Sequence, residues 1–214
     1  MSQPWSARAP KVLGLSLTAA EAAIYESLVV PRYVLVFAAP ALSMLIPHTP
    51  ANVVHLGSRT GFLAQQLSEQ LPGCTVSGVD NSAPAVELAR AKASLLRNVT
   101  ASYHVSEQLP SPLPAGQFTH AVAVHPMGLK GDYSRLFEEL YRLLSPGGQL
   151  IVSLPLRGSF PEVYDMLREF ALRHDKPAFG EAVDLATSTR PNPETLAQQV
   201  EGAGFNEVEV GVEL

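Results

Sequence analysis

Short apolar runs alternate with amphipathic stretches through most of the chain. Between the runs, apolar residues recur with helical spacing, as Leu63, Leu67 and Leu71 do. Strictly alternating strands and helices predict a mainly parallel sheet with helices on both faces, which is a three-layer α/β/α fold. The runs that predict strands are Val53–Leu56, Thr75–Val79, Val99–Val105, Thr119–Val124 and Leu150–Leu154.

Proline, glycine and serine mark where the helices between these strands begin and end. A turn is expected at residues 145–148, with the sequence SPGG. We expect residues 174–191 to be irregular and Phe205–Leu214, with valines at alternate positions, to form a last strand. The expected helices are Thr60–Leu71, Ser82 to about Arg97, Tyr133–Leu144, about Phe160–Leu172 and Pro193 to Gly202.

The N-terminal part has its own pattern. Residues 1–17 look like a loose arm rich in proline and serine. Thr18, followed three residues later by Glu21, is a capping box and predicts the start of a helix. Pro31 is expected to break this helix, and a second helical piece is expected to run to about Ile46. We therefore assign 1–50 to an N-terminal arm and helical lid and 51–214 to the main domain, within one structural unit.

Composition limits the class of protein. The 214 residues are 46% apolar and 16% charged, which is typical of a folded globular chain. The net charge of −5 and the lack of a basic cluster argue against nucleic-acid binding. A single cysteine, Cys74, fits a reducing, cytoplasmic compartment. We expect no signal peptide. The apolar stretch Leu28–Ile46 contains two prolines and an arginine, so we interpret it as helices packed on the core, with a membrane-surface role as the minor alternative.

One motif carries chemistry. The first predicted strand runs into LGSRTG, a turn bracketed by Gly57 and Gly61, and the second predicted strand ends in Asp80 about 20 residues later. A strand, a glycine-rich turn, a helix and an acid at this distance are the layout of a nucleotide-binding βαβ unit. The motif therefore predicts an adenosine-bearing cofactor.

From about Tyr25 to Phe205, the chain resembles the class I S-adenosylmethionine-dependent methyltransferases that act on small molecules. The resemblance implies a Rossmann-like fold, methyl transfer to a small-molecule acceptor, and S-adenosylmethionine as cofactor. The segments that carry it are IYESLVVPR, LGSRTG, SGVDNSAPAVELARAKA, LFEELYRLLSPGGQLIVSLP and GAGF.

The resemblance also implies roles for single residues. Gly57 and Gly61 would let the backbone pass close to the cofactor, because a Cβ there would collide with it. The amides that open the helix at Thr60–Phe62 would lie near the methionine carboxylate. Asp80 would accept hydrogen bonds from both ribose hydroxyls.

Further positions would contact the adenine or the methionine end. Asn81 and Ser82 would line the adenine edge, and Glu107 or Ser106 would lie near its amine. Tyr25 belongs to the lid, and His125 faces the crevice at the end of its strand. The whole set of predicted cofactor-binding residues is Tyr25, His55, Gly57, Ser58, Arg59, Gly61, Asp80, Asn81, Ser82, Ser106, Glu107 and His125.

Several positions depart from the family's usual pattern. His55 stands where an acid usually helps hold the cofactor's ammonium group; a neutral imidazole could accept a hydrogen bond, whereas a protonated one would repel the ammonium. Arg59 replaces a glycine, and could turn outward, pair with the carboxylate or fill the pocket. Val105 replaces an acid after the third strand, and Thr119 or His120 replaces one that opens the fourth.

The end of the sheet departs as well. The family's sheet usually ends with a hairpin of two strands, but only one is predicted before Leu214. The sheet is then short, or a partner chain covers its edge, as in a homodimer or a complex with another protein, or further residues complete it.

The resemblance leaves the chemistry of the acceptor open. His125 is the one weak candidate for a general base, and a pocket wall is the alternative. We predict no metal site, because His104 and His120 lack ligand spacing. The segments Tyr25 to Ile46 and Leu156–Arg190 would build a pocket for a small organic or acyl-type acceptor. Two alternatives remain: an inactive methyltransferase-like scaffold module, and a modified cofactor with extra negative charge that would suit Arg59 and His55.

Overall fold

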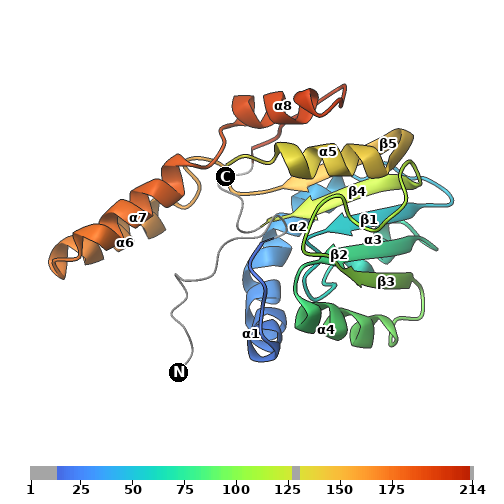
Figure 1. Ribbon diagram of the computed structural model, residues 1–214, viewed down its shortest axis with the longest axis horizontal. Coiled ribbons are helices and arrows are strands. Elements are labelled where there is room, and N and C mark those ends of the chain that lie inside the picture. Colours follow the sequence, from blue (N-terminus) through green and yellow to red (C-terminus); the bar gives the residue numbers. More distant parts are fainter. Residues whose placement is uncertain (1–13, 127–130, 213–214) are drawn as a thin grey trace. The chain divides into compact units, whose positions relative to one another are not determined.

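The protein contains a parallel β-sheet (Figure 1). The computed structural model describes residues 14–126 and 131–212. Its sheet has five strands in the order β3-β2-β1-β4-β5, and every pairing is parallel. The strands are β1 Asn52–Leu56, β2 Thr75–Asp80, β3 Thr100–Val105, β4 Phe118–Val124 and β5 Leu144–Ser153. The predicted α/β architecture is confirmed.

Helices alternate with the strands along the chain. The capping box predicted at Thr18 and Glu21 is present, and Ser82 caps α4 by accepting a hydrogen bond from the amide of Ala85. The helical segments are α1 Ala19–Ile24, η2 Tyr25–Val34, α2 Leu35–Ser43, α3 Ala64–Gln70, α4 Ala83–Ala93, α5 Ser134–Leu143, α6 Pro161–Arg173, α7 Pro177–Ser188 and α8 Pro193–Gly202.

The chain divides into two compact units, the first within residues 1–129 and 135–154 and the second within 130–134 and 155–214. The first unit contains the N-terminal helices and the whole sheet. The second contains α6, α7 and α8. The predicted domain boundary near residue 50 stays a prediction.

The N-terminal helix is continuous, so the predicted break at Pro31 was wrong. Pro31 lies inside η2, a π-helical segment that joins α1 to α2. A π-helix has a wider turn than an α-helix, and this accommodates a residue that has no amide hydrogen to donate. The second helical piece ends at Ser43 rather than near Ile46.

Ala19–Ser43 is long and apolar enough to cross a membrane by length and composition, although core helices and signal sequences pass the same test. Its residues Val30, Val34 and Ala38 are buried in one cluster with Val122 and Val124 of β4. One side of the helix therefore packs on the core, and 28% of its most apolar 18-residue window is buried.

The two faces of the sheet are covered by different helices. Alternate strand residues, such as Val53 and Val122, pack in one cluster with apolar residues of α2 and α3. On the opposite face lies α5, which buries Phe137 and Leu140 (Figure 1). This arrangement leaves the carboxyl ends of β1, β2 and β4 at one edge of the sheet.

The segment SPGG is not the separate turn that was predicted. β5 begins at Leu144, which pairs with Phe118, and the register then jumps so that Gln149 pairs with His120. The residues between them form a bulge in which Gly147 adopts φ +75°.

Two predictions for the C-terminal part were also wrong. Residues 174–191 contain α7, and Gly180 faces the Cβ of Ala171 in α6, so small residues let these two helices approach closely. Residues 205–212, the described part of the predicted last strand, form no strand. Alternating valines define two faces, but a strand also needs a hydrogen-bonded neighbour. Residues 213 and 214 lie outside the described residues.

Candidate active site at the carboxyl edge of the sheet

The order of the strands defines the place where a ligand is expected. The connections run outward from β1 on one side to β2 and β3, and on the other side β4 lies beside β1. Ligands of open parallel sheets bind at such a switch point, outside the carboxyl ends of the strands. The loop 57–63 follows β1, Asp80 ends β2, and His125 follows β4.

Asp80 is the centre of a polar network. Its carboxylate accepts hydrogen bonds from the amides of Arg59, at 3.0 Å, and Ser82, at 2.9 Å. The guanidinium of Arg59 lies 3.6 Å away. Asp80 is fully buried, and burial raises its pKa more than Arg59 and the backbone hydrogen bonds lower it. The carboxylate therefore ties the glycine-rich loop to the end of β2.

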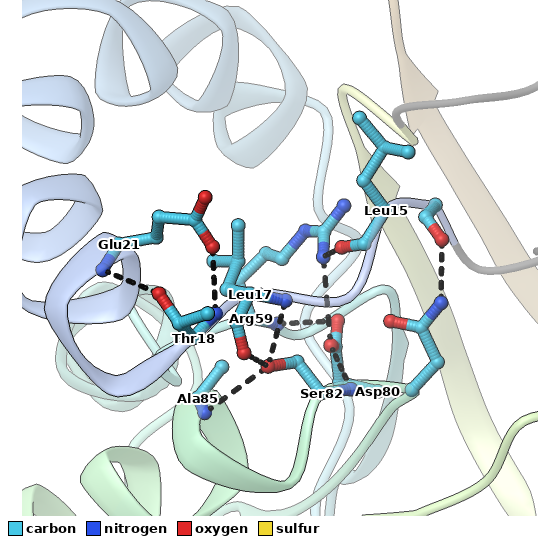
Figure 2. Close-up of polar contacts among 10 residues, drawn as sticks. Leu15, Leu17, Thr18, Glu21, Arg59, Asp80, Ser82 and Ala85 are labelled. Carbon is cyan, nitrogen blue, oxygen red and sulfur yellow. Dashed lines mark hydrogen bonds and ion pairs between the residues drawn. The ribbon is translucent and has the colours of Figure 1, made fainter. Parts of the chain in front are cut away.

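An N-terminal segment covers this network (Figure 2). We call Gly14–Leu17 the strap. The guanidinium of Arg59 donates to the carbonyl of Leu15 at 2.5 Å, and the side-chain amide of Asn81 donates to the carbonyl of Gly14 at 2.5 Å. The Ser82 hydroxyl donates to the carbonyl of Leu17 at 2.9 Å and accepts from its amide at 3.1 Å. The prediction of a loose arm was therefore wrong for residues 14–17.

Of the three orientations considered for Arg59, the side chain adopts an inward one. It is only 3% exposed, and it occupies the space between Asp80 and the strap. Its backbone has φ +48°, in the left-handed region that glycine adopts without strain. The left-handed backbone explains why glycine is the family's usual residue at this position. Residues held in this region often lie at functional sites.

Four buried polar atoms of β1, the loop 57–63 and Asn81 have no hydrogen-bond partner among the residues that the structure describes. They belong to side chains that are at most 2% exposed. A buried polar atom without a partner costs about 1–3 kcal/mol, so such atoms mark places where a ligand's polar groups would be stabilised. The atoms are His55 Nε2, Ser58 Oγ, Thr60 Oγ1 and Asn81 Oδ1.

His55 is held in its neutral form. Complete burial lowers the pKa of His55 to about 3, and its ring packs edge-on against Phe62 at 5.3 Å between centroids. At neutral pH its Nε2 is thus compatible with accepting a hydrogen bond from a cationic group. The repulsive, protonated form considered from the sequence does not apply at that pH.

The two loop glycines differ in what surrounds them. Both have left-handed backbones, with φ +72° at Gly57 and +69° at Gly61. A Cβ added to Gly57 would meet nothing within 4 Å, whereas one added to Gly61 would lie 2.6 Å from the hydroxyl of Tyr103. Gly61 is therefore required by packing within the protein. Tyr103, on β3, also fills the space beside Gly78, and no local pattern predicted its place here.

The helix after the loop begins later than predicted. α3 starts at Ala64, so Thr60–Phe62 lie in the preceding turn and their amides do not open the helix. The positive φ at Gly61, together with the packing of Tyr103 against it, places the turn before the helix. The N-terminus of α3 therefore lies at Ala64, beyond the amides that were predicted to open the helix.

The remaining predicted residues differ in how they relate to the network. Tyr25 is buried, and this burial raises the pKa of its hydroxyl. The charge of Arg59 lowers that pKa and the charge of Asp80 raises it, so Tyr25 lies within the electrostatic reach of the network. The Ser106 amide donates to the Asp80 carbonyl at 2.8 Å, whereas the Glu107 side chain is exposed.

A second cluster lies where β4 ends. The hydroxyl of Tyr33 and Nε2 of His125 are 2.9 Å apart. Phe37 completes a group of three rings that meet edge to face, with centroids 5.0–5.1 Å apart. His125, like Arg59, has φ +48°, and its amide donates to the carbonyl of Ser153. The partners from η2 and α2 were not predicted, because no local pattern links them to β4.

The sequence of this chain is similar to those of known methyltransferases. Residues 53–148 match the family model described as a methyltransferase domain. The demethylmenaquinone methyltransferase of Thermus thermophilus is 31% identical over 175 residues, which cover 78% of this chain and 79% of that protein. This chain belongs to the class I S-adenosylmethionine-dependent methyltransferases. Trans-aconitate 2-methyltransferase of Deinococcus radiodurans is 37% identical over 120 residues, covering 55% of this methyltransferase and 44% of that one.

A solved structure agrees with the fold. Phosphoethanolamine N-methyltransferase 2 of Haemonchus contortus, in complex with S-adenosyl-L-methionine, superposes with a TM-score of 0.65 at 19% identity. The match covers 90% of this methyltransferase and 43% of the nematode chain. At this identity, the likeness supports the fold alone. Among residues 14–126 and 131–212, no three His, Cys, Asp or Glu side chains gather as a metal site would require.

Proposed function

We propose that this methyltransferase transfers the methyl group of S-adenosylmethionine to a small-molecule acceptor. The observation that carries the proposal is the buried carboxylate of Asp80, together with buried polar atoms of β1, the loop 57–63 and Asn81 that lack partners among the described residues. These groups fit an adenosyl ligand, because Asp80 would accept from ribose hydroxyls and Asn81 and Ser82 would face the adenine. Neutral His55 would accept from the ammonium group. When bound, the cofactor supplies a methyl group on a positively charged sulfur.

The acceptor would bind beside His125. Three aromatic rings at the switch point favour a planar, apolar molecule, and the Tyr33–His125 pair favours one with a hydroxyl group. Methylation of such an acceptor releases a proton. Tyr33 Oη would receive it while the proton of Tyr33 passes to His125 Nε2. The name of the Thermus relative supports an acceptor of the reduced-quinone class.

Titration calorimetry and a turnover assay test this proposal. S-adenosylhomocysteine, the demethylated product, is expected to bind the intact chain with a stoichiometry of about one. Methyl transfer is then measured with a short-chain 1,4-naphthohydroquinone that lacks the ring methyl group, and with trans-aconitate as the competing acceptor class. Binding with turnover of the hydroquinone supports both parts. Turnover of trans-aconitate alone would overturn the acceptor. No binding at about 1 mM ligand, either to the intact chain or to a variant in which the strap is weakened, would overturn the whole proposal.

One observation favours the inactive alternative, namely that the strap and Arg59 occupy the space next to Asp80. The related proteins carry the names of active enzymes and lend it no support. Turnover with any acceptor excludes it. A partner chain at the edge of the sheet and a cytoplasmic location stay predictions.

A further inference from the structure

The strap lies on the groups that an adenosyl ligand would use. Gly14, Leu15 and Leu17 take hydrogen bonds from Asn81, Arg59 and Ser82, and all three of these residues flank Asp80. Asp80 is fully buried in this arrangement. A ribose therefore has no access to the carboxylate while the strap is in place.

We propose that the strap and the adenosyl part of the cofactor are alternative occupants of this site, so that cofactor binding releases residues 14–17. The inference rests on the proposed function. It assigns to the N-terminal segment a competitive role, in which the chain's own carbonyl groups substitute for ligand atoms.

The hydrogen bonds of the strap explain why it would be replaceable. Its carbonyls accept from three donors, but Asn81 Oδ1, Ser58 Oγ and Thr60 Oγ1 find no partner among the described residues. A ligand that carries both donors and acceptors would satisfy groups that the strap leaves unsatisfied. The strap therefore fills the site without meeting all of its polar requirements.

The backbone of the strap offers a way to weaken it without touching the cofactor site. Gly14 has φ +102°, a value that residues with a Cβ rarely adopt. Replacing Gly14 by alanine strains the strap only when it is docked. Gly158 is a matched control, because it has φ +92°, a Cβ there would meet nothing within 4 Å, and it lies in the other unit of the chain.

The affinity for S-adenosylhomocysteine then reports on the strap. When a competing conformation dominates, the apparent Kd equals the intrinsic Kd divided by the fraction of molecules that can bind. We expect Gly14→Ala to lower the apparent Kd about five- to thirtyfold, the factor that corresponds to roughly 1–2 kcal/mol of left-handed strain. Gly158→Ala is expected to leave the Kd unchanged.

Amide hydrogen exchange follows the release itself. The Leu17 amide, which donates to Ser82 Oγ, is expected to lose protection when S-adenosylhomocysteine saturates the protein, while the Val54 amide in β1 keeps its protection. Ligand binding usually increases the protection of amides against hydrogen exchange. A loss of protection confined to the strap therefore indicates that the ligand has replaced it.

The outcomes separate the two proposals. If the ligand binds wild type and Gly14→Ala equally well and Leu17 stays protected, the strap proposal is wrong and the proposed function stands. If the ligand binds neither protein, the proposed function is wrong, and the strap proposal is wrong with it. Binding to Gly14→Ala alone, or binding to both with the expected gain in affinity and loss of protection at Leu17, supports the exchange.

Discussion

The two sides of the candidate site differ in their chemistry, because one is polar and the other is aromatic. On the β1–β2 side, Asp80, Arg59 and Ser82 are buried and joined by a dense set of hydrogen bonds, with the strap above them. On the β4 side, three half-buried rings meet around the hydrogen bond between Tyr33 and His125. The first arrangement recognises a polar ligand group by group, and the second accommodates an apolar one by shape.

This difference indicates that each side of the site holds a different reactant in the proposed reaction. Methyl transfer mainly requires that the acceptor be held in line with the methyl group, because positioning alone supplies about 7–11 kcal/mol. The polar side fixes the cofactor, and the aromatic side fixes the acceptor. A variant on one side is then expected to leave the other side's ligand unaffected.

The largest effect is expected on the aromatic side. Asparagine tolerates the left-handed backbone at residue 125, so His125→Asn should fold, but it removes the proton acceptor. We expect turnover of the hydroquinone to fall by about 10²–10⁴-fold, the usual contribution of general base catalysis, with an unchanged Kd for S-adenosylhomocysteine. Tyr33→Phe should lose turnover as well and shift the pH–rate profile. Full turnover in both variants would contradict a role in proton transfer.

The polar side is broken by Asp80→Asn. This change keeps the shape but removes the charge that ribose hydroxyls would contact, and we expect the Kd for S-adenosylhomocysteine to rise roughly a hundredfold, as for the loss of ~3 kcal/mol from charged hydrogen bonds. Glu139→Gln is the matched control, because Glu139 is a buried carboxylate that pairs with Arg142 at 2.6 Å. Calorimetry on both variants, after thermal unfolding has verified the fold, decides the outcome. If both variants bind S-adenosylhomocysteine as tightly as wild type does, Asp80 is not part of the binding site.

The pH dependence of stability tests whether His55 is neutral. The pKa of His55 is lowered to about 3 in the folded protein, whereas an unfolded histidine has a pKa of about 6.5. Between these values the unfolded chain binds a proton that the folded chain does not, so stability falls as the pH drops below about 6.5.

The measurement is denaturant unfolding of wild type and His55→Leu. Between about pH 6.5 and about pH 5, wild type should lose roughly 2 kcal/mol more than the variant. His120, whose pKa burial also lowers, is present in both proteins and cancels in the difference. Parallel pH profiles would mean that His55 is accessible to protons.

The last comparison concerns the two loop glycines. Gly61→Ala and Gly57→Ala introduce the same left-handed strain, but only the Cβ at residue 61 would collide with Tyr103. We expect Gly61→Ala to be less stable than Gly57→Ala by about 1–3 kcal/mol, the usual cost of overpacking. Thermal and denaturant unfolding measure the difference. Equal losses would show that strain alone decides the choice of glycine.

Local patterns predicted the parts of this fold that depend on local physics. The strands β1 to β4, the capping box at Thr18, the cap at Ser82 and the position of Asp80 at the end of β2 follow from periodicity and short spacings. The α7 helix, the bulge in β5 and the lack of a strand at 205–212 depend on partners elsewhere in the chain, and were missed.

The site shows the same limit. The glycine loop and Asp80 were visible as a motif, whereas the strap reaches Asn81 from 67 positions away and Tyr33 reaches His125 from 92. One signal for the strap is present in the sequence, where Leu15 and Leu17 alternate with small residues as in a segment packed on one side. Contacts over such separations arise from the fold and not from local spacing.

The central claim is that an adenosyl ligand binds at Asp80. Titration of the intact chain with S-adenosylhomocysteine, followed by calorimetry, tests it most directly. We predict saturable heat with a stoichiometry of about one, and binding that is roughly a hundredfold weaker in Asp80→Asn. An absence of binding at about 1 mM ligand, in wild type and in Gly14→Ala alike, would contradict it.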